Sequence, residues 1–148
     1  MKSSRAPARV LAIDFGKVRA GIAISDELGL YAHARPALDA TNRKSILAAL
    51  TQIIRDEGVE RLLIGLPLEL SGDRGPAARR ALQFAQELAD ATGIEVELID
   101  ERLSTVEAGR QLRASGVSGR KQKAMVDGVA ASVLLQSWLD GRRRDLDG

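Results

Sequence analysis

Residues 10–25 read VLAIDFGKVRAGIAIS. They contain two apolar runs, Val10–Phe15 and Ala20–Ser25, and the first run is interrupted only by Asp14. The short segment between them, Gly16–Arg19, has the length and the glycine of a tight hairpin connection. We therefore predict a β-hairpin in which an acidic residue lies near the end of the first strand.

The rest of the chain predicts strands and helices from apolar periodicity and from stop signals such as Gly58 and Gly93. Pro36 should make the end of the third strand irregular. The elements expected after the hairpin are a strand over 30–38, a helix from Thr41 or Asn42 to about Glu57, a strand over 61–66, a helix over 77–92, a strand over 95–99, a helix from the capping-box pattern Ser104–Glu107, and a last helix ending near Asp140.

Strands that come first and then alternate with helices imply an α/β protein with a mixed five-stranded sheet flanked by helices. The ribonuclease-H-like fold has the same order of elements, although other α/β layouts share it at this level of detail. The length of 148 residues fits one domain. We expect the basic residues 1–8 and the tail 141–148 to be flexible.

The composition excludes several classes of site. The chain has no cysteine, which rules out disulfides, thiolate metal sites and a cysteine nucleophile and suits a reducing cytoplasm. The single histidine, His33, cannot form a histidine-based zinc site, and we interpret it as a loop or edge-strand residue. No apolar run is long enough to span a membrane. A net charge of +2 permits nucleic-acid binding without demonstrating it.

Three acidic residues stand where a charge is costly or unexpected. Asp127 shares a helical stripe with Ala130, Ala131, Leu134 and Trp138, which should be the core-facing stripe. An unpaired charge is costly to bury there, so either a salt bridge, an exposed first turn or a bound cation must compensate it. Asp14, near the end of its strand, could alternatively cap the hairpin.

Glu101 ends the strand that begins at Glu95, and strand alternation puts its neighbour Asp100 on the opposite face. A carboxylate at a strand end is common, so Glu101 is a weak candidate by itself. Together, Asp14, Glu101 and Asp127 could converge on a hard cation, for which Mg²⁺ or Mn²⁺ is the natural choice.

Four blocks of this sequence resemble the YqgF/RuvX family of pre-16S rRNA nucleases or Holliday-junction-resolvase-like proteins. They are Asp14–Ala23, which fits D-x-G-x-x-R-x-G-x-A, Gly65-Leu66-Pro67 followed by Gly72, Asp100–Thr105, and Asp127–Ala131. The blocks follow in order from about Val10 to Leu139. The resemblance implies that Asp14, Glu101 and Asp127 are the catalytic residues and the metal ligands, with Arg19 and Gly16 in the loop beside them.

The sequence departs from the family pattern at two places. Glu69 and Ser71 stand where relatives more often carry Asn and Asp, which puts local substrate contacts in doubt. Classical junction resolvases of this fold have a further acidic group or a histidine one turn after the helix aspartate, and Ala130 stands there in this chain. We expect a three-carboxylate centre to hold its second metal weakly until substrate phosphate adds ligands.

Basic residues accompany the acidic motifs along the chain. Lys17 and Arg19 lie on the hairpin, although Arg19 could equally be structural, and Arg120 precedes the Asp127 helix. The residues that we expect to hold a phosphate backbone are Lys17, Arg19, Arg74, Arg102, Lys121 and Lys123. The chain has only four aromatic residues, so recognition should depend on backbone and shape more than on base edges.

The function that follows is phosphodiester hydrolysis by metal-activated water, which needs no histidine base. The resemblance implies 5′-end maturation of pre-16S rRNA by a cytoplasmic monomer or homodimer that needs no membrane. The alternatives are a Holliday junction resolvase acting on structured DNA, which should be a two-fold dimer, and a non-catalytic RNA-processing or transcription factor. An ATP-binding domain of the actin/hexokinase type would need a second domain.

Overall fold

The computed structural model describes residues 8–67, 74–100 and 119–147, and within the last range it describes the side chains of residues 128–142. The sheet has the strand order β3-β2-β1-β4-β5; β2 is antiparallel to β1 and β3, and β4 is parallel to β1 and β5. The predicted mixed five-stranded sheet is confirmed. The elements are β1 (Arg9–Phe15), β2 (Arg19–Ser25), β3 (Ala32–Asp39), α1 (Arg43–Glu57), β4 (Val59–Leu66), α2 (Pro76–Thr92), β5 (Val96–Asp100) and α4 (Gly119–Asp147).

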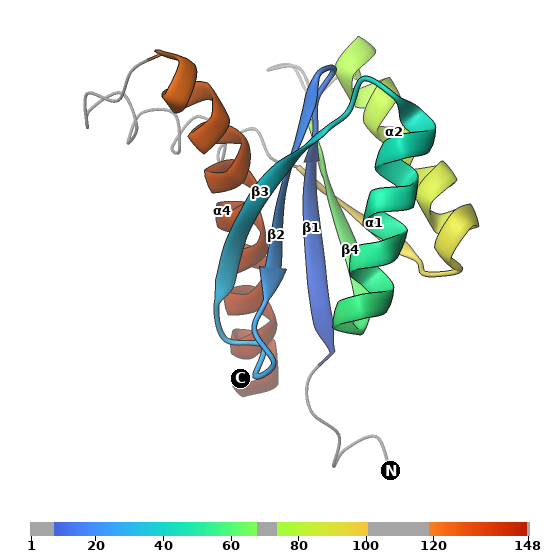
Figure 1. Cartoon of the computed structure of the whole chain (residues 1–148). Coiled ribbons are helices and arrows are strands. Elements are labelled where there is room, and N and C mark those ends of the chain that lie inside the picture. The colour runs from blue at the N-terminus through green and yellow to red at the C-terminus, as the bar shows by residue number, and fades with distance from the viewer. Residues whose placement is uncertain (1–7, 68–73, 101–118, 148) are drawn as a thin grey trace.

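Helices cover both faces of this sheet: α1 and α2 lie on one face and α4 on the other (Figure 1). Along β1, the side chains of Leu11, Ile13 and Phe15 belong to the cluster with α1 and α2, whereas Val10 and Ala12 belong to the cluster with α4. The central strand is therefore buried on both faces, which explains its almost continuous apolar sequence.

The helix boundaries follow the predicted local signals. Of the two candidate caps for α1, the structure selects Asn42, whose side chain accepts a hydrogen bond of 3.0 Å from the Ser45 N–H. The helix ends at Gly58, which adopts the left-handed conformation at φ 65°. α2 begins with Pro76 in its first turn and ends at Gly93, at φ 74°.

Pro36 lies inside β3 without ending it, because β3 is an edge strand of the sheet and needs ladder partners on one side only. The irregularity that Pro36 predicts is found in the pairing with β2, where the register shifts between Ala20 and Ile22. β3 starts at Ala32, later than predicted, because residues 26–31 form a turn in which the Asp26 N–H donates to the Tyr31 carbonyl oxygen at 3.1 Å.

The prediction that the last helix ends near Asp140 was wrong, because α4 continues to Asp147. Gly141 does not act as a stop and has no positive φ. The Arg142 guanidinium lies 5.5 Å from the centroid of the Trp138 ring, one turn earlier, so these last turns have a side-chain contact of their own. The helix predicted from Ser104 lies outside the described residues.

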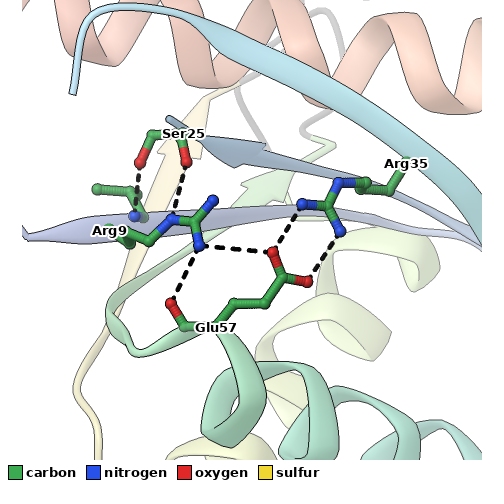
Figure 2. Close-up of polar contacts among 5 residues, drawn as sticks. Arg9, Ser25, Arg35 and Glu57 are labelled. Carbon is green, nitrogen blue, oxygen red and sulfur yellow. Dashed lines mark hydrogen bonds and ion pairs between the residues drawn. The ribbon is translucent and has the colours of Figure 1, made fainter. Parts of the chain in front are cut away.

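A carboxylate joins the C-terminal end of α1 to two strands (Figure 2). Glu57 accepts hydrogen bonds of 2.8 and 2.6 Å from the Arg35 guanidinium of β3 and pairs with Arg9 of β1 at 3.6 Å. Arg9 also donates to the backbone carbonyl oxygens of Glu57 and Ser25. The hydrogen bond from Arg35 holds the pKa of Glu57 below its ordinary value, and the charge of Arg9 adds to this effect.

We expect Glu57→Gln to lower the free energy of unfolding by ~1 kcal/mol at pH 7, because the partly exposed pair loses its charge assistance. The folded pKa lies below the unfolded one, so this stability is present above about pH 4.3 and is lost as the pH falls through the folded pKa. Urea unfolding of both proteins should show a smaller difference at low pH.

The neighbouring exposed residue Asp56 provides the control. Its carboxylate accepts a hydrogen bond from Gln52 on the same helix, and Asp56→Asn should change stability by less than about 0.5 kcal/mol. If the difference in free energy of unfolding between wild type and Glu57→Gln stays constant from neutral to acid pH, the pKa of Glu57 is not lowered by folding and the prediction is wrong.

Candidate metal and nucleic-acid site

Asp14 is the last residue but one of β1 and lies at the edge of the sheet where the parallel strands β1, β4 and β5 end. Alternation along β1 places it on the same face as Val10 and Ala12, which is the face that α4 covers. It is half-buried and has a polar partner in the structure. The sequence prediction of a carboxylate at the end of a buried strand is confirmed.

Glycines flank Asp14 in the two neighbouring strands. Gly21 of β2 is its register partner, and Gly65 of β4 stands one position beyond the Ile13–Ile64 pair. Gly65 follows Leu63, a member of the α4 cluster, by two residues and so lies on the α4 face as well. Neither neighbour adds a side chain on that face, so the sheet leaves room beside the Asp14 carboxylate for a bound cation.

Asp127 lies in α4, and its side chain is outside the described set. The stripe that follows it is as predicted: Ala130, Ala131 and Leu134 are buried against the sheet and Trp138 packs at the edge of the same cluster. Helical spacing places position 127 on that stripe. A Cβ on the adjacent Gly128 would lie 3.6 Å from the Ala34 Cβ, so the helix backbone is close to β3 here.

The direction of α4 brings position 127 toward the Asp14 edge. Near its C-terminal end, Trp138 and Arg142 meet Arg61 and Glu97, which lie near the starts of β4 and β5. Because α4 runs back along the sheet from there, its earlier turns approach the carboxyl ends of the strands (Figure 1).

Glu101 lies outside the described residues, and so do Arg102 and the loop positions Glu69 and Ser71. The structure does test the rival of Glu101. Asp100 pairs with Leu66, and Leu66 belongs to the cluster with α1 and α2, so Asp100 lies on the face opposite to Asp14. Of the two rival carboxylates, the structure thus describes Asp100 and places it on the face that Asp14 does not share.

The predicted basic residues lie around this edge as far as they are described. Lys17 is exposed at the tip of the β1–β2 hairpin, and Arg19, half-buried, opens β2 opposite Asp39. Arg74 is exposed just before α2. Lys121 and Lys123 belong to the first turns of α4, and their side chains lie outside the described set. His33 is exposed on the edge strand β3, as expected.

The sequence interpretation missed Arg43, the first residue of α1. Its guanidinium carbon lies 5.6 Å from the ring centroids of both Phe15 and Phe84, directly behind the strand end that carries Asp14. One local signal could have identified it: Arg43 follows the cap Asn42 in a first turn that has no acidic residue, where the helix dipole favours a negative charge.

In the described part of the chain, no three acidic or histidine side chains gather into a metal-binding group. Only one of the three predicted ligands, Asp14, has a described side chain, so the convergence of all three stays a prediction. The donor type fits the expected ions, because carboxylate oxygens are what Mg²⁺ and Mn²⁺ prefer. The described helices include none long and apolar enough to cross a membrane.

Two solved resolvase structures have a similar arrangement of helices and strands. Thermus thermophilus RuvC, in complex with Holliday junction substrate, aligns with a TM-score of 0.59 at 14% identity and covers 93% of this chain and 96% of that chain. The Fowlpox virus resolvase, in complex with Holliday junction DNA, aligns with a TM-score of 0.52 at 11% identity, over 90% of this chain and 98% of its own. At these identities the likeness shows the fold, which is the expected ribonuclease-H-like one.

The sequence comparisons are more specific. A profile of the RuvX family, described as Holliday junction resolvase, matches residues 8–141. A relative from Anaeromyxobacter dehalogenans, named as a pre-16S rRNA nuclease, is 47% identical over 134 residues, which are 90% of this chain and 98% of that protein. A relative from Myxococcus xanthus with the same name is 42% identical over 91% of this chain and 89% of its own. The chain belongs to the RuvX family.

The hairpin beside Asp14 is tightly closed at Gly16. Its N–H donates to the Arg19 carbonyl oxygen at 3.0 Å, and a Cβ at Gly16 would lie only 2.7 Å from that oxygen. The tip is also held from outside, because the Ala40 N–H donates to the Val18 carbonyl oxygen at 2.7 Å. The loop that carries Lys17 is thus fixed relative to the end of β1.

We expect Gly16→Ala to destabilise the protein by roughly 1–3 kcal/mol, because the added methyl group forces the hairpin backbone apart. Thermal or urea unfolding measures this cost. Gly128→Ala is the matched control: its Cβ would meet only ordinary van der Waals contacts, and alanine favours the helix, so stability should be unchanged or higher. Equal stability of Gly16→Ala and wild type would show that the hairpin closes less tightly.

Proposed function

We propose that this protein is a metal-dependent nuclease that hydrolyses phosphodiester bonds and acts in the 5′-end maturation of pre-16S rRNA in the cytoplasm. The observation that carries the proposal is the Asp14 carboxylate: it lies one residue before the end of the central strand, faces α4 between two glycine positions, and begins the motif that resembles the RuvX family. The names of the curated relatives support rRNA precursor as the substrate.

Asp14, Glu101 and Asp127 would hold Mg²⁺ or Mn²⁺. When bound, such ions lower the pKa of a water to generate hydroxide and stabilise the leaving oxygen. The sheet edge would supply Asp14, and helical spacing from the buried residues Ala131 and Leu134 would put position 127 on the same side. The exposed side chains of Lys17 and Arg74, with Arg19 beside them, would neutralise the phosphates on either side of the scissile bond.

The central test is cleavage of a labelled pre-16S rRNA 5′ segment, single-stranded DNA and a four-way DNA junction with Mg²⁺ or Mn²⁺. We expect the RNA to be cleaved and Asp14→Asn to lower kcat by about 100-fold or more, as when one transition-state-stabilising group is removed. Asp90→Asn, on the exposed side of α2, should cleave like wild type.

Three other outcomes of the cleavage assay would contradict the proposed function or its site. Activity that survives Asp14→Asn would overturn the proposed site. Metal-dependent cleavage of the junction but not of the RNA would make the protein a junction resolvase, and tight RNA binding without cleavage of any substrate would make it a non-catalytic factor.

We expect Lys17→Gln to raise KM for RNA with little effect on kcat, because the exposed ammonium contacts phosphate and not the reacting atoms. The slope of log affinity against log salt concentration should fall by roughly 1. Arg55→Gln is the control: Arg55 is also exposed but lies in the last turn of α1, at the sheet edge where β4 begins. If the salt slope changes equally in both variants, the effect comes from the overall charge of the protein and Lys17 does not contact phosphate directly.

A further inference from the structure

The end of β1 that carries Asp14 lies between β2 and β4. Between β1 and β2 the register continues to Phe15–Ala20, and between β1 and β4 it runs from Arg9–Val59 to Ile13–Ile64. The place of this strand end also depends on what its side chains contact on the two faces of the sheet.

Phe15 provides a contact of that kind. It is the last residue of β1, and its ring lies on the α1/α2 face, opposite to the Asp14 carboxylate. The Phe15 ring stacks on Phe84 of α2 with centroids 4.1 Å apart and planes inclined by 3°. Phe84 is completely buried, so the ring that receives Phe15 is itself fixed in the core.

The guanidinium of Arg43 lies beside this stack. Its guanidinium carbon is 5.6 Å from each of the two ring centroids, so it lies beside the pair and not above one ring. The same guanidinium pairs with Glu87 of α2, at 2.5 Å between Arg43 Nη1 and Glu87 Oε1. The two side chains are about one-third exposed, so the pair holds α1 to α2 across the rim of the stack.

We propose that Phe15, Phe84, Arg43 and Glu87 are positioning residues, which set the place of the Asp14 carboxylate by holding the end of β1 against α2. This inference rests on the proposed function, in which Asp14 holds the metal. Adjacent residues of a strand point to opposite faces, so a movement of the Phe15 ring toward or away from α2 moves the Asp14 side chain relative to α4. Ligands of a hard cation such as Mg²⁺ tolerate little displacement.

The variants Phe84→Leu, Arg43→Met and Glu87→Gln remove the ring, the guanidinium and the charge of its partner in turn. We expect each to weaken Mn²⁺ binding, measured by calorimetric titration, and to lower kcat, both by roughly 10-fold, as when groups that orient metal ligands are lost. KM for RNA should stay within about 2-fold of wild type, because none of these side chains contacts the substrate. Without metal, the amides of Phe15 and Gly16 should exchange with solvent faster.

Glu87→Gln separates positioning from a direct phosphate contact of Arg43. A positioning role predicts the same loss of Mn²⁺ affinity in Arg43→Met and Glu87→Gln. A phosphate contact predicts opposite changes of KM, because the loss of the Glu87 charge leaves the guanidinium more available to the substrate. Opposite changes of KM with unchanged Mn²⁺ affinity would overturn the inference.

Glu57→Gln is the matched control for loss of stability. It breaks an ion pair of the same kind at the other end of α1, where Glu57 contacts Arg35 and Arg9. We expect it to lower the melting temperature without changing Mn²⁺ affinity or kcat. If it weakens Mn²⁺ binding as much as Phe84→Leu does, or if Glu87→Gln and Arg43→Met bind Mn²⁺ like wild type, the positioning role is wrong.

Asp14→Asn distinguishes this failure from failure of the proposed function. If wild type binds no Mn²⁺, or if Asp14→Asn binds it equally well, the proposed metal site is wrong and the positioning inference falls with it. If Asp14→Asn loses Mn²⁺ binding while the Arg43 and Glu87 variants keep it, only the positioning inference is wrong. The conservative Arg43 and Glu87 variants keep the test valid even if Phe84→Leu does not fold.

Discussion

β1 lies at the centre of the sheet with packed side chains on both of its faces, so a charged group on it needs a compensating partner. The strand satisfies this constraint by carrying its only acidic residue, Asp14, at the end where the parallel strands stop. A carboxylate in that place is close enough to the core to be held rigidly and close enough to the sheet edge to meet a substrate. The proposed chemistry depends on this combination.

The two faces of the sheet differ in the size of their side chains. The α1/α2 face contains the large rings Phe15 and Phe84 and most of the leucine and isoleucine side chains of the core. The α4 face is built from smaller residues near Asp14, such as Ala12 and Ala23, with Ala131 opposite them on the helix. Small residues let a helix approach a sheet closely, which a metal held between α4 and β1 would require.

The local elements could be predicted well because their signals are local. The hairpin at 10–25, the Asn42 cap and the glycine stops at Gly58 and Gly93 depend on backbone conformations that neighbouring residues dictate. The end of α4 could not be predicted in this way. Gly141 is a stop signal by composition, but the contact between Arg142 and Trp138 forms only when the helix continues.

The candidate site, too, could be predicted from the sequence only in part. The order of acidic motifs and the position of Asp14 at a strand end follow from the sequence, because apolar periodicity and spacing are properties of the chain itself. The stack of Phe15 on Phe84 and its closure by Arg43 and Glu87 could not be predicted, since these residues are brought together from β1, α1 and α2 by packing.

The sequence alone therefore determined which residue types were available for the chemistry, the hairpin that carries Asp14 and the alternation that sets Asp100 apart from Glu101. The tertiary structure decided which face of the sheet Asp14 occupies, that α4 covers this face, and that Phe15 stacks on Phe84 on the opposite face. The physical reason is that strand register and layer packing are contacts between segments distant in the chain, whose free energy no local pattern contains.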